Sequence, residues 1–271
     1  MKIKIKKAVL PVAGMGTRFL PATKVVPKEL LPIIDKPVIQ YLVEEAVLSG
    51  VEEIIFVISK GKELIKKHFS HHPELEEILR DRGKHDLLDK INPIHKMAKF
   101  SYVYQKEPLG DGHAVLMAEK LVGNEPFLVL FGDDIVKNNV PAAKQLVDHF
   151  HGESILAVEK IPKKNSKLYG IIRPGKQDGR LYEVLDMVEK PEPNDAPSDL
   201  GVIGKYVCPP EIFSALKKAT PGKDGEIRLI DGFNELKKRQ KIYAYEIEGI
   251  RFDTGRPEGL VAASKAYLAE I

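Results

Sequence analysis

The chain has 271 residues, 43% of them hydrophobic and 30% charged, so it is long enough to bury a full core as one large α/β domain or two small ones. Lys and Arg together number 42 and Asp and Glu 39, and the formal charge of only +3 argues against a nucleic-acid-binding surface as the main function. Cys208 is the only cysteine, so the sequence allows no intramolecular disulfide.

No targeting or membrane segment is evident in the sequence. Residues 1–7 are basic and alternating, but no apolar core of signal-peptide length follows them. No stretch stays apolar for the length that a membrane-spanning helix needs. We therefore expect a cytoplasmic protein.

In the first half of the chain, short apolar segments alternate with helical patterns. The apolar spacing over 38–49 predicts a helix that ends at Gly50. Because strands joined by helical crossovers pair in parallel, the order predicts an α/β fold with a doubly wound, mostly parallel sheet flanked by helices. Ligands of such sheets gather at the carboxyl ends of the strands, where Gly132 and Asp133 lie. The strands are predicted at 7–12, 53–58, 100–104 and 126–131.

Residues 60–99 are charged and largely helical, which favours a solvated helical insertion with helices at 63–69, 74–82 and 85–90. Its histidines do not have the spacing of a zinc site, so we interpret them as surface residues. These histidines are His68, His71, His72, His85 and His95.

The second half is more irregular, and it shows neither an internal repeat nor an obvious linker. We therefore predict a single domain over 1–271, with the helical insertion at about 60–99. Strands are predicted at 155–158, 170–173, 181–189, 201–208 and 242–246, and helices at 211–218, 231–239 and 257–268.

The segment Ala13-Gly14-Met15-Gly16-Thr17-Arg18 follows the first predicted strand directly. Small residues leave backbone N–H groups open to phosphate oxygens, and Arg18 and Lys28 add fixed cations, so the segment favours polyphosphate binding. Without those cations an ordinary glycine-rich turn would be an equally good interpretation. The segment lacks the ending of a Walker loop, and Arg18 and Phe19 stand where a dinucleotide fingerprint needs an open helix start, which argues against a nicotinamide-dependent dehydrogenase.

Two aspartates follow predicted strands and could bind a metal ion. Asp133 is a good candidate ligand of Mg²⁺, because that ion usually takes few protein carboxylates and shares phosphate oxygens. Asp253 offers a second carboxylate in a similar setting. Taken singly, each is explained as well by an ordinary turn aspartate.

Two further segments carry groups suited to a base and a sugar. Gln105 presents a donor and an acceptor together, as recognition of a pyrimidine edge requires, and Gly110 permits close approach of a flat ring. Glu189 can accept hydrogen bonds from sugar hydroxyls, and the neighbouring Lys190 can hold a sugar phosphate. A surface ion pair is the simpler alternative for these last two.

Together these segments closely resemble the sugar nucleotidyltransferases, specifically the prokaryotic UTP–glucose-1-phosphate uridylyltransferase family, over nearly the whole chain. The glycine turn is shared by the superfamily, whereas Pro-Ala-Thr-Lys at 21–24 and the insertion from 74–76 to 87–89 are typical of the uridylyl branch. The segments that carry the resemblance are 10–18, 20–24, 27–32, 109–114, 188–191 and 225–229.

The resemblance implies a Rossmann-like nucleotidyltransferase fold with a small β-rich sugar-binding part. It also implies a nucleotide site in which Ala13 and Gly14 contact the nucleotide by their backbones. Glu29, Gln105 and Gly110 would face the uracil of UTP.

The same resemblance implies the catalytic and sugar-binding residues. Arg18 and Lys28 would hold the triphosphate, and Asp133, which also belongs to the nucleotide site, would bind Mg²⁺ together with Asp253. The sugar-binding residues would be Gly170 and Glu189 for glucose, and Lys190 for its phosphate.

The activity implied is transfer of uridylyl from UTP to glucose 1-phosphate, giving UDP-glucose and pyrophosphate by Mg²⁺-assisted in-line displacement at the α-phosphate. Relatives often form dimers or tetramers, so a homodimer or homotetramer is expected. A thymidylyl- or dual-specificity enzyme stays open, because Asp-Thr-Gly at 253–255 is more usual in thymidylyl and mannose-1-phosphate guanylyl relatives. A catalytically silent regulatory subunit is disfavoured, because the charged site residues are all present.

Overall fold

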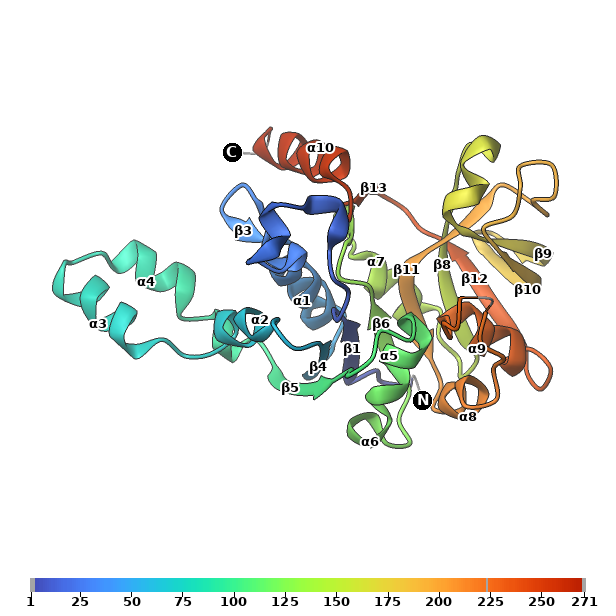
Figure 1. Cartoon of the computed structure of the whole chain (residues 1–271), viewed down its shortest axis with the longest axis horizontal. Helices are drawn as coiled ribbons and strands as arrows, with labels where there is room; N and C mark the ends of the chain where they lie inside the picture. The colour runs from blue at the N-terminus through green and yellow to red at the C-terminus, as the bar shows by residue number, and fades with distance from the viewer. Residues whose placement is uncertain (1–2, 223, 270–271) are drawn as a thin grey trace.

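The computed structural model describes residues 3–222 and 224–269, which are built around one large mixed sheet with helices on both faces (Figure 1). Within these residues the sheet has nine strands in the order β5-β4-β1-β6-β11-β8-β12-β10-β9, and two small two-stranded sheets accompany it. The strands are β1 (Lys7–Pro11), β2 (Pro32–Ile33), β3 (Lys36–Pro37), β4 (Glu53–Ile58), β5 (Lys99–Tyr104), β6 (Phe127–Leu130), β7 (Asp134–Lys137), β8 (Ser154–Lys160), β9 (Gly170–Asp178), β10 (Leu181–Glu189), β11 (Leu200–Cys208), β12 (Ile242–Glu246) and β13 (Ile250–Asp253).

The half of the sheet formed by β5, β4, β1 and β6 is parallel. Its strands are buried on both faces: in β1, Ala8 and Leu10 join the hydrophobic cluster on one side of the sheet and Val9 joins the cluster on the other. This explains why these segments are continuous apolar runs instead of alternating ones. The carboxyl ends of β1 and β6 are neighbours, so the turns that follow them share one edge of the sheet.

The other half of the sheet is mixed. β11 runs antiparallel between β6 and β8, β12 is parallel to β8, and β10 and β9 complete the edge as antiparallel strands. The predicted α/β fold with a helix-flanked sheet is confirmed. The sheet is mixed and not mostly parallel, because in this second half only β8 and β12 pair in parallel. An additional pairing of β9 with β11, at Ile171 and Gly201, brings the start of β9 and the end of β10 next to the strand that neighbours β6.

The helices form two layers. α1 and α7 pack on one face of the sheet, and α5, α8 and α9 pack on the other. α3 and α4 extend away from the rest of the molecule (Figure 1). The helices are α1 (Val38–Leu48), α2 (Glu63–His68), α3 (Pro73–Asp81), α4 (His85–Ile91), α5 (Asp111–Met117), α6 (Glu119–Val122), α7 (Ala142–Asp148), α8 (Glu211–Leu216), α9 (Leu229–Leu236) and α10 (Pro257–Leu268). None of the helices in the described residues has the length and apolar character that crossing a membrane requires.

The small sheet of β7 and β13 brings two distant acidic segments together. The strands pair antiparallel with Asp253 opposite Asp134, so the turn after β6 and the turn after β13 lie side by side. The Thr254 N–H and hydroxyl both donate to the Asp133 carbonyl oxygen, at 2.8 and 2.9 Å. The pairing fixes the positions of both aspartates that the sequence proposes as metal ligands.

Candidate active site

A cavity of about 340 Å³ opens at the carboxyl ends of β1 and β6, and we call it the glycine-turn cavity. Gly14 is exposed there, and a Cβ added to it would have no atom within 4 Å, so the backbone of the turn faces open space. Gly16 adopts φ +68°, a left-handed conformation that suits glycine. Its carbonyl accepts a hydrogen bond from the Thr23 hydroxyl at 2.8 Å, which holds the turn. The predicted residues that line the cavity are Ala13, Gly14, Lys28, Glu29, Gln105, Gly110 and Asp133.

Lys28 and Asp133 form an ion pair in this cavity, with Lys28 Nζ 2.5 Å from Asp133 Oδ2. Burial alone would lower the pKa of Lys28, but the carboxylates of Asp133 and Glu29 raise it above its usual value. Burial alone would raise the pKa of Asp133, whereas Lys28, Arg251 and Arg18 hold it below its usual value. Both partners are therefore charged at neutral pH.

Glu29 is buried beneath the same cavity and pairs with Lys62. Lys62 Nζ lies 2.9 and 2.8 Å from the two carboxylate oxygens. Burial is the largest cause of the raised pKa of Glu29 and of the lowered pKa of Lys62, because it disfavours both charges. Lys62 thus orients a side chain that the sequence places near the base.

Gln105 stands at the end of β5 with its amide turned toward the start of α5. Its Nε2 donates to the Gly110 carbonyl at 3.0 Å and lies 3.0 Å from His113 Nδ1. Gly110 has φ +99°, and a Cβ there would lie 2.5 Å from the Ile227 carbonyl oxygen. Only glycine therefore fits between this loop and the 225–229 segment.

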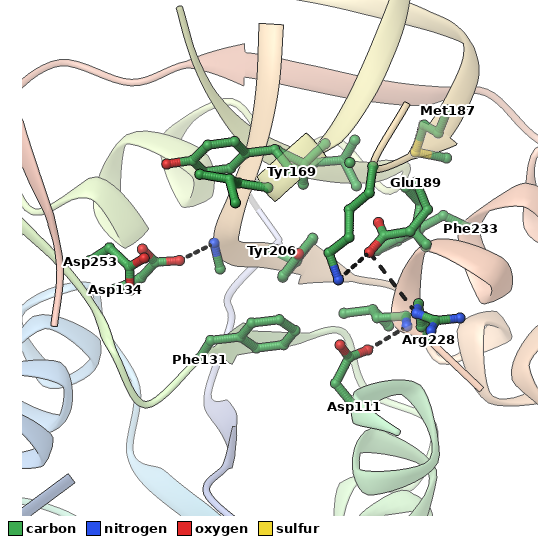
Figure 2. A pocket seen from close by; sticks show the side chains of 18 of the residues that line it. Asp111, Phe131, Asp134, Tyr169, Met187, Glu189, Tyr206, Arg228, Phe233 and Asp253 are labelled. Atoms are coloured by element: carbon green, nitrogen blue, oxygen red, sulfur yellow. Dashed lines mark hydrogen bonds and ion pairs between the residues drawn. The ribbon is translucent and has the colours of Figure 1, made fainter. Parts of the chain in front are cut away.

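A second cavity of about 270 Å³, the Glu189 cavity, lies against β9, β10 and β11 (Figure 2). Gly170 packs against its wall: a Cβ there would lie 2.7 Å from Ile230 Cδ1 and 3.2 Å from Glu189 Oε2. Of the predicted residues, this cavity is lined by Arg18, Gly170, Glu189, Lys190 and Asp253.

Glu189 and Lys190 stand together at the end of β10. Lys190 Nζ lies 3.2 Å from Glu189 Oε1, and Arg228 Nε lies 4.0 Å from the same oxygen (Figure 2). Lys190 has φ +47°, which a non-glycine residue rarely adopts, and its N–H donates to the Tyr169 carbonyl at 3.0 Å. The unusual backbone conformation turns consecutive carboxylate and ammonium groups toward one cavity.

The carboxylates of Asp133 and Asp253 meet at Gly255. A Cβ on Gly255 would collide with the Asp133 carboxylate and would lie 3.0 Å from Asp253 Oδ1. Asp133 lines the glycine-turn cavity and Asp253 lines the Glu189 cavity, so the pair connects the two. The cavities also share Asp111 and Phe131 as lining residues.

This carboxylate pair fits a hard divalent cation. Mg²⁺ is commonly held by one or two carboxylates, with water and phosphate oxygens completing its shell. Among residues 3–222 and 224–269 no cluster of three or more His, Cys, Asp or Glu side chains could hold a metal by itself. The remaining ligands would therefore come from the substrate and from water.

Sequence reasoning missed a charged network behind these carboxylates. Arg251 on β13 donates to Asp134, to Glu159 Oε1 at 2.8 Å and to the Tyr169 hydroxyl at 3.0 Å. Asp134 also accepts the Gly204 N–H at 2.6 Å. The network fixes the β7–β13 sheet against β8, β11 and the residue that precedes β9. Its partners are far apart in the sequence, so no local pattern could have indicated it.

Comparison with known proteins gives one consistent result. The family model for nucleotidyl transferases matches residues 7–270. UTP–glucose-1-phosphate uridylyltransferases of Staphylococcus epidermidis and Bacillus subtilis are 48% and 47% identical to the chain over 266 residues, which cover 97% of it and 92% and 91% of those proteins.

Solved structures agree with the sequence relatives. A UDP-glucose pyrophosphorylase complexed with UDP-glucose has a TM-score of 0.89 and 42% identity, covering 98% of this chain and 100% of that one. A UTP-bound UGPase from Acinetobacter baumannii has a TM-score of 0.92 and 37% identity, covering 98% and 94%. With the family model matching almost the whole length, the chain belongs to the nucleotidyl transferase family.

Proposed function

We propose that this chain transfers the uridylyl group of UTP to glucose 1-phosphate, forming UDP-glucose and pyrophosphate. The observation that carries the proposal is the meeting of Asp133 and Asp253 at Gly255, where a cavity with a glycine turn adjoins a cavity with Glu189 and Lys190. UTP and UDP-glucose are the ligands named for solved relatives, which supports this choice of substrates.

The two cavities divide the substrates between them. The glycine-turn cavity would take UTP, with Ala13 and Gly14 against the nucleotide and with Glu29, Gln105 and Gly110 near the base. The Glu189 cavity would take glucose 1-phosphate. There Glu189 accepts hydrogen bonds from sugar hydroxyls, the Gly170 backbone approaches the ring, and Lys190 binds the phosphate.

The chemical step needs no general base, because the attacking phosphate oxygen of glucose 1-phosphate is already an anion. The obstacle is repulsion between two polyanions, so catalysis depends on positioning and on fixed cations. Lys190 would hold the attacking phosphate in line with the α-phosphorus. Lys28 would draw negative charge toward the departing pyrophosphate, and so would Arg18, which lines the Glu189 cavity but acts electrostatically on Asp133 and Lys28.

Nucleotidyl transferases generally use a divalent metal ion, and we propose Mg²⁺ at Asp133 and Asp253. When bound there, the ion would neutralise charge on the α-phosphate. In this structure Lys28 provides the counter-charge to Asp133. Cytoplasmic location and homo-oligomeric assembly stay predictions.

An assay of the purified protein tests the proposal directly. Pyrophosphate and sugar-nucleotide formation would be measured with UTP, dTTP and other nucleoside triphosphates against glucose, galactose and N-acetylglucosamine 1-phosphates. We expect the highest kcat/KM for UTP with glucose 1-phosphate, and no turnover after chelation of divalent metal. A higher kcat/KM with dTTP than with UTP would show that the protein is a thymidylyltransferase. The absence of pyrophosphate with every combination of nucleotide and sugar phosphate would contradict the proposal.

A further inference from the structure

Asp111 has no role in the mechanism above, although its side chain stands where the two cavities meet. It is the first residue of α5, and it lines both the glycine-turn cavity and the Glu189 cavity. Figure 2 shows its carboxylate pointing into the Glu189 cavity between Phe131 and Arg228. A charged group in that place faces whatever the cavity binds.

The two carboxylate oxygens of Asp111 have different surroundings. Oδ1 accepts the Leu229 N–H at 2.7 Å, which holds the side chain in one orientation. No donor from the described part of the chain reaches Oδ2. The carboxylate thus combines a fixed direction with one oxygen available to a ligand.

The electrostatic surroundings favour a ligand that donates a hydrogen bond. The Asp111 side chain is exposed to the cavity, and the protein atoms around it still restrict its hydration. Burial raises the pKa of Asp111 to about 6; the Leu229 hydrogen bond opposes this rise and the Glu189 carboxylate adds to it. At neutral pH the group is mostly ionised and acts as a hydrogen-bond acceptor.

The charges around the Glu189 cavity indicate which part of the ligand reaches Asp111. Arg18, Lys190 and Arg256 line the same cavity and would attract a phosphate. Arg228 also lines it beside Asp111, but its guanidinium already pairs with the Asp224 carboxylate, so the Asp111 end of the cavity would repel a phosphate. The uncharged, hydroxyl-bearing ring of a sugar phosphate is therefore the part suited to Asp111.

We propose that Asp111 Oδ2 accepts a hydrogen bond from a ring hydroxyl of the hexose 1-phosphate, which makes Asp111 a specificity-determining residue. The inference rests on the proposed function, and it adds to Glu189 and Lys190 a second carboxylate that selects the sugar. Once the sugar fills the cavity, Asp111 Oδ2 is shielded from water, so an analogue that lacks the hydroxyl leaves this oxygen unpaired and is discriminated against.

The test uses glucose 1-phosphate and its 2-, 3-, 4- and 6-deoxy analogues as substrates. Some deoxy analogues should react slowly because they lack a hydroxyl that Glu189 binds. With the wild-type protein, one further analogue should also lose about 10- to 100-fold in kcat/KM, as expected for a lost hydrogen bond to the charged Asp111 carboxylate. In the Glu189→Gln variant, the analogues that lack a hydroxyl bound by Glu189 should lose their kcat/KM penalty relative to glucose 1-phosphate. The analogue that lacks the hydroxyl bound by Asp111 should keep its penalty in that variant.

Asp111→Asn is the decisive variant. An Asn side chain still offers Oδ1 to the Leu229 N–H, but it presents an NH₂ group to the cavity in place of an acceptor. We expect this variant to discriminate at least about fivefold less against the sensitive deoxy analogue, because a hydrogen bond from the amide to the hydroxyl oxygen is uncharged and weaker than one to the carboxylate. Asp89→Asn, an exposed position on α4, is the matched control and should keep the wild-type pattern.

A binding measurement supplies a readout independent of turnover. By calorimetry, Asp111→Asn should weaken UDP-glucose by about tenfold and leave UDP within about twofold, because only the hexose contacts the carboxylate. Equal weakening of both ligands would assign Asp111 to the nucleotide or to the fold and would overturn the inference.

The outcomes separate the inference from the proposed function. If the wild-type protein forms UDP-glucose but Asp111→Asn keeps every deoxy penalty, the inference is wrong and the proposed function stands. If the wild-type protein forms no sugar nucleotide, both are wrong. Loss of discrimination in Asp111→Asn alone, with UDP binding retained, supports the inference.

Discussion

Asp133 is the side chain on which the proposed chemistry depends most. It pairs with Lys28, meets Asp253 at Gly255, and lines the glycine-turn cavity. No other carboxylate in the described residues combines these three contacts. Its removal should therefore affect metal binding and turnover together.

We predict that Asp133→Ala lowers kcat at least about 100-fold, because transition-state charge loses its metal partner. Electron paramagnetic resonance of Mn²⁺ in the presence of UTP should show loss of the bound ion in the same variant. Asp89→Ala should change neither quantity. A variant at 133 that keeps most of the metal-dependent rate would exclude Asp133 from the site.

Lys190 should separate the two substrates. It lines only the Glu189 cavity of the two, so Lys190→Ala is expected to raise KM for glucose 1-phosphate by about 10- to 100-fold, the worth of a charge-assisted hydrogen bond. The KM for UTP should change little. Lys167→Ala, whose exposed side chain pairs with Glu192, is the control. Equal losses for both substrates would refute this division.

The sequence predicts the candidate residues of the two cavities better than it predicts what holds them. Glycine turns, strand-end aspartates and Glu189-Lys190 are local patterns, and the structure gathers all of them around the two cavities. Lys62 and Arg251 could not be predicted, because their partners come from separate elements. The metal, base and sugar roles of the predicted residues stay predictions until they are measured.

The start of α5 and the 225–229 segment are joined through their backbones. The Ile227 N–H donates to the Leu109 carbonyl at 2.8 Å, and the His113 N–H donates to the Ile227 carbonyl at 3.2 Å. This close contact leaves no room for a side chain at Gly110 or Gly112. It also connects the loop beside the base with the segment that begins α9.

Gly110→Ala should lower the free energy of unfolding by more than the backbone strain of an alanine with positive φ, because its Cβ would also collide with the Ile227 carbonyl. Gly123 also has a positive φ, +70°, but a Cβ there meets nothing within 4 Å, so Gly123→Ala measures the conformational cost alone. We expect urea unfolding to show a loss of about 1–2 kcal/mol for Gly123→Ala and about 2 kcal/mol more for Gly110→Ala. Equal losses would mean that the backbone at Ile227 moves aside freely.

Several elements with strong local patterns have their predicted bounds, whereas others were placed less well. β9 runs to Asp178 and not to 173, because it continues to pair with β10, and α9 ends at Leu236 and not at 239. The strands at 53–58, 181–189 and 242–246 and the helix at 257–268 have their predicted bounds. α9 begins at Leu229 instead of 231, because the Arg228 N–H donates to Asp231 Oδ2 and starts the helix earlier. β7 was not predicted, since its four residues depend on pairing with β13, more than a hundred residues away.

A buried ion pair connects the two halves of the molecule. Lys205 on β11 is fully buried, and its Nζ lies 2.7 Å from Glu45 Oε2 on α1. The other Glu45 oxygen accepts the Ala143 N–H at the start of α7, at 2.8 Å. One carboxylate therefore joins α1, α7 and the central strand of the mixed sheet.

Breaking this pair should destabilise the whole fold. Lys205→Met leaves the Glu45 charge buried without its partner, so we expect a loss of about 3–5 kcal/mol in the free energy of unfolding. The double variant Lys205→Met/Glu45→Gln should recover part of it, because Gln removes the charge and still accepts the Ala143 N–H. No recovery in the double variant would assign the loss to packing instead of the unpaired charge.

The central claim is that both substrates lie in the joined cavities at once and react in a single displacement. The configuration at the α-phosphorus tests this most directly. The substrate would be a single diastereomer of UTP in which sulfur replaces one non-bridging oxygen on that phosphorus. One in-line displacement inverts the configuration in the UDP-glucose product, and the structure predicts inversion. Retention would require an even number of displacements, hence a covalent uridylyl-enzyme intermediate, and would contradict the account.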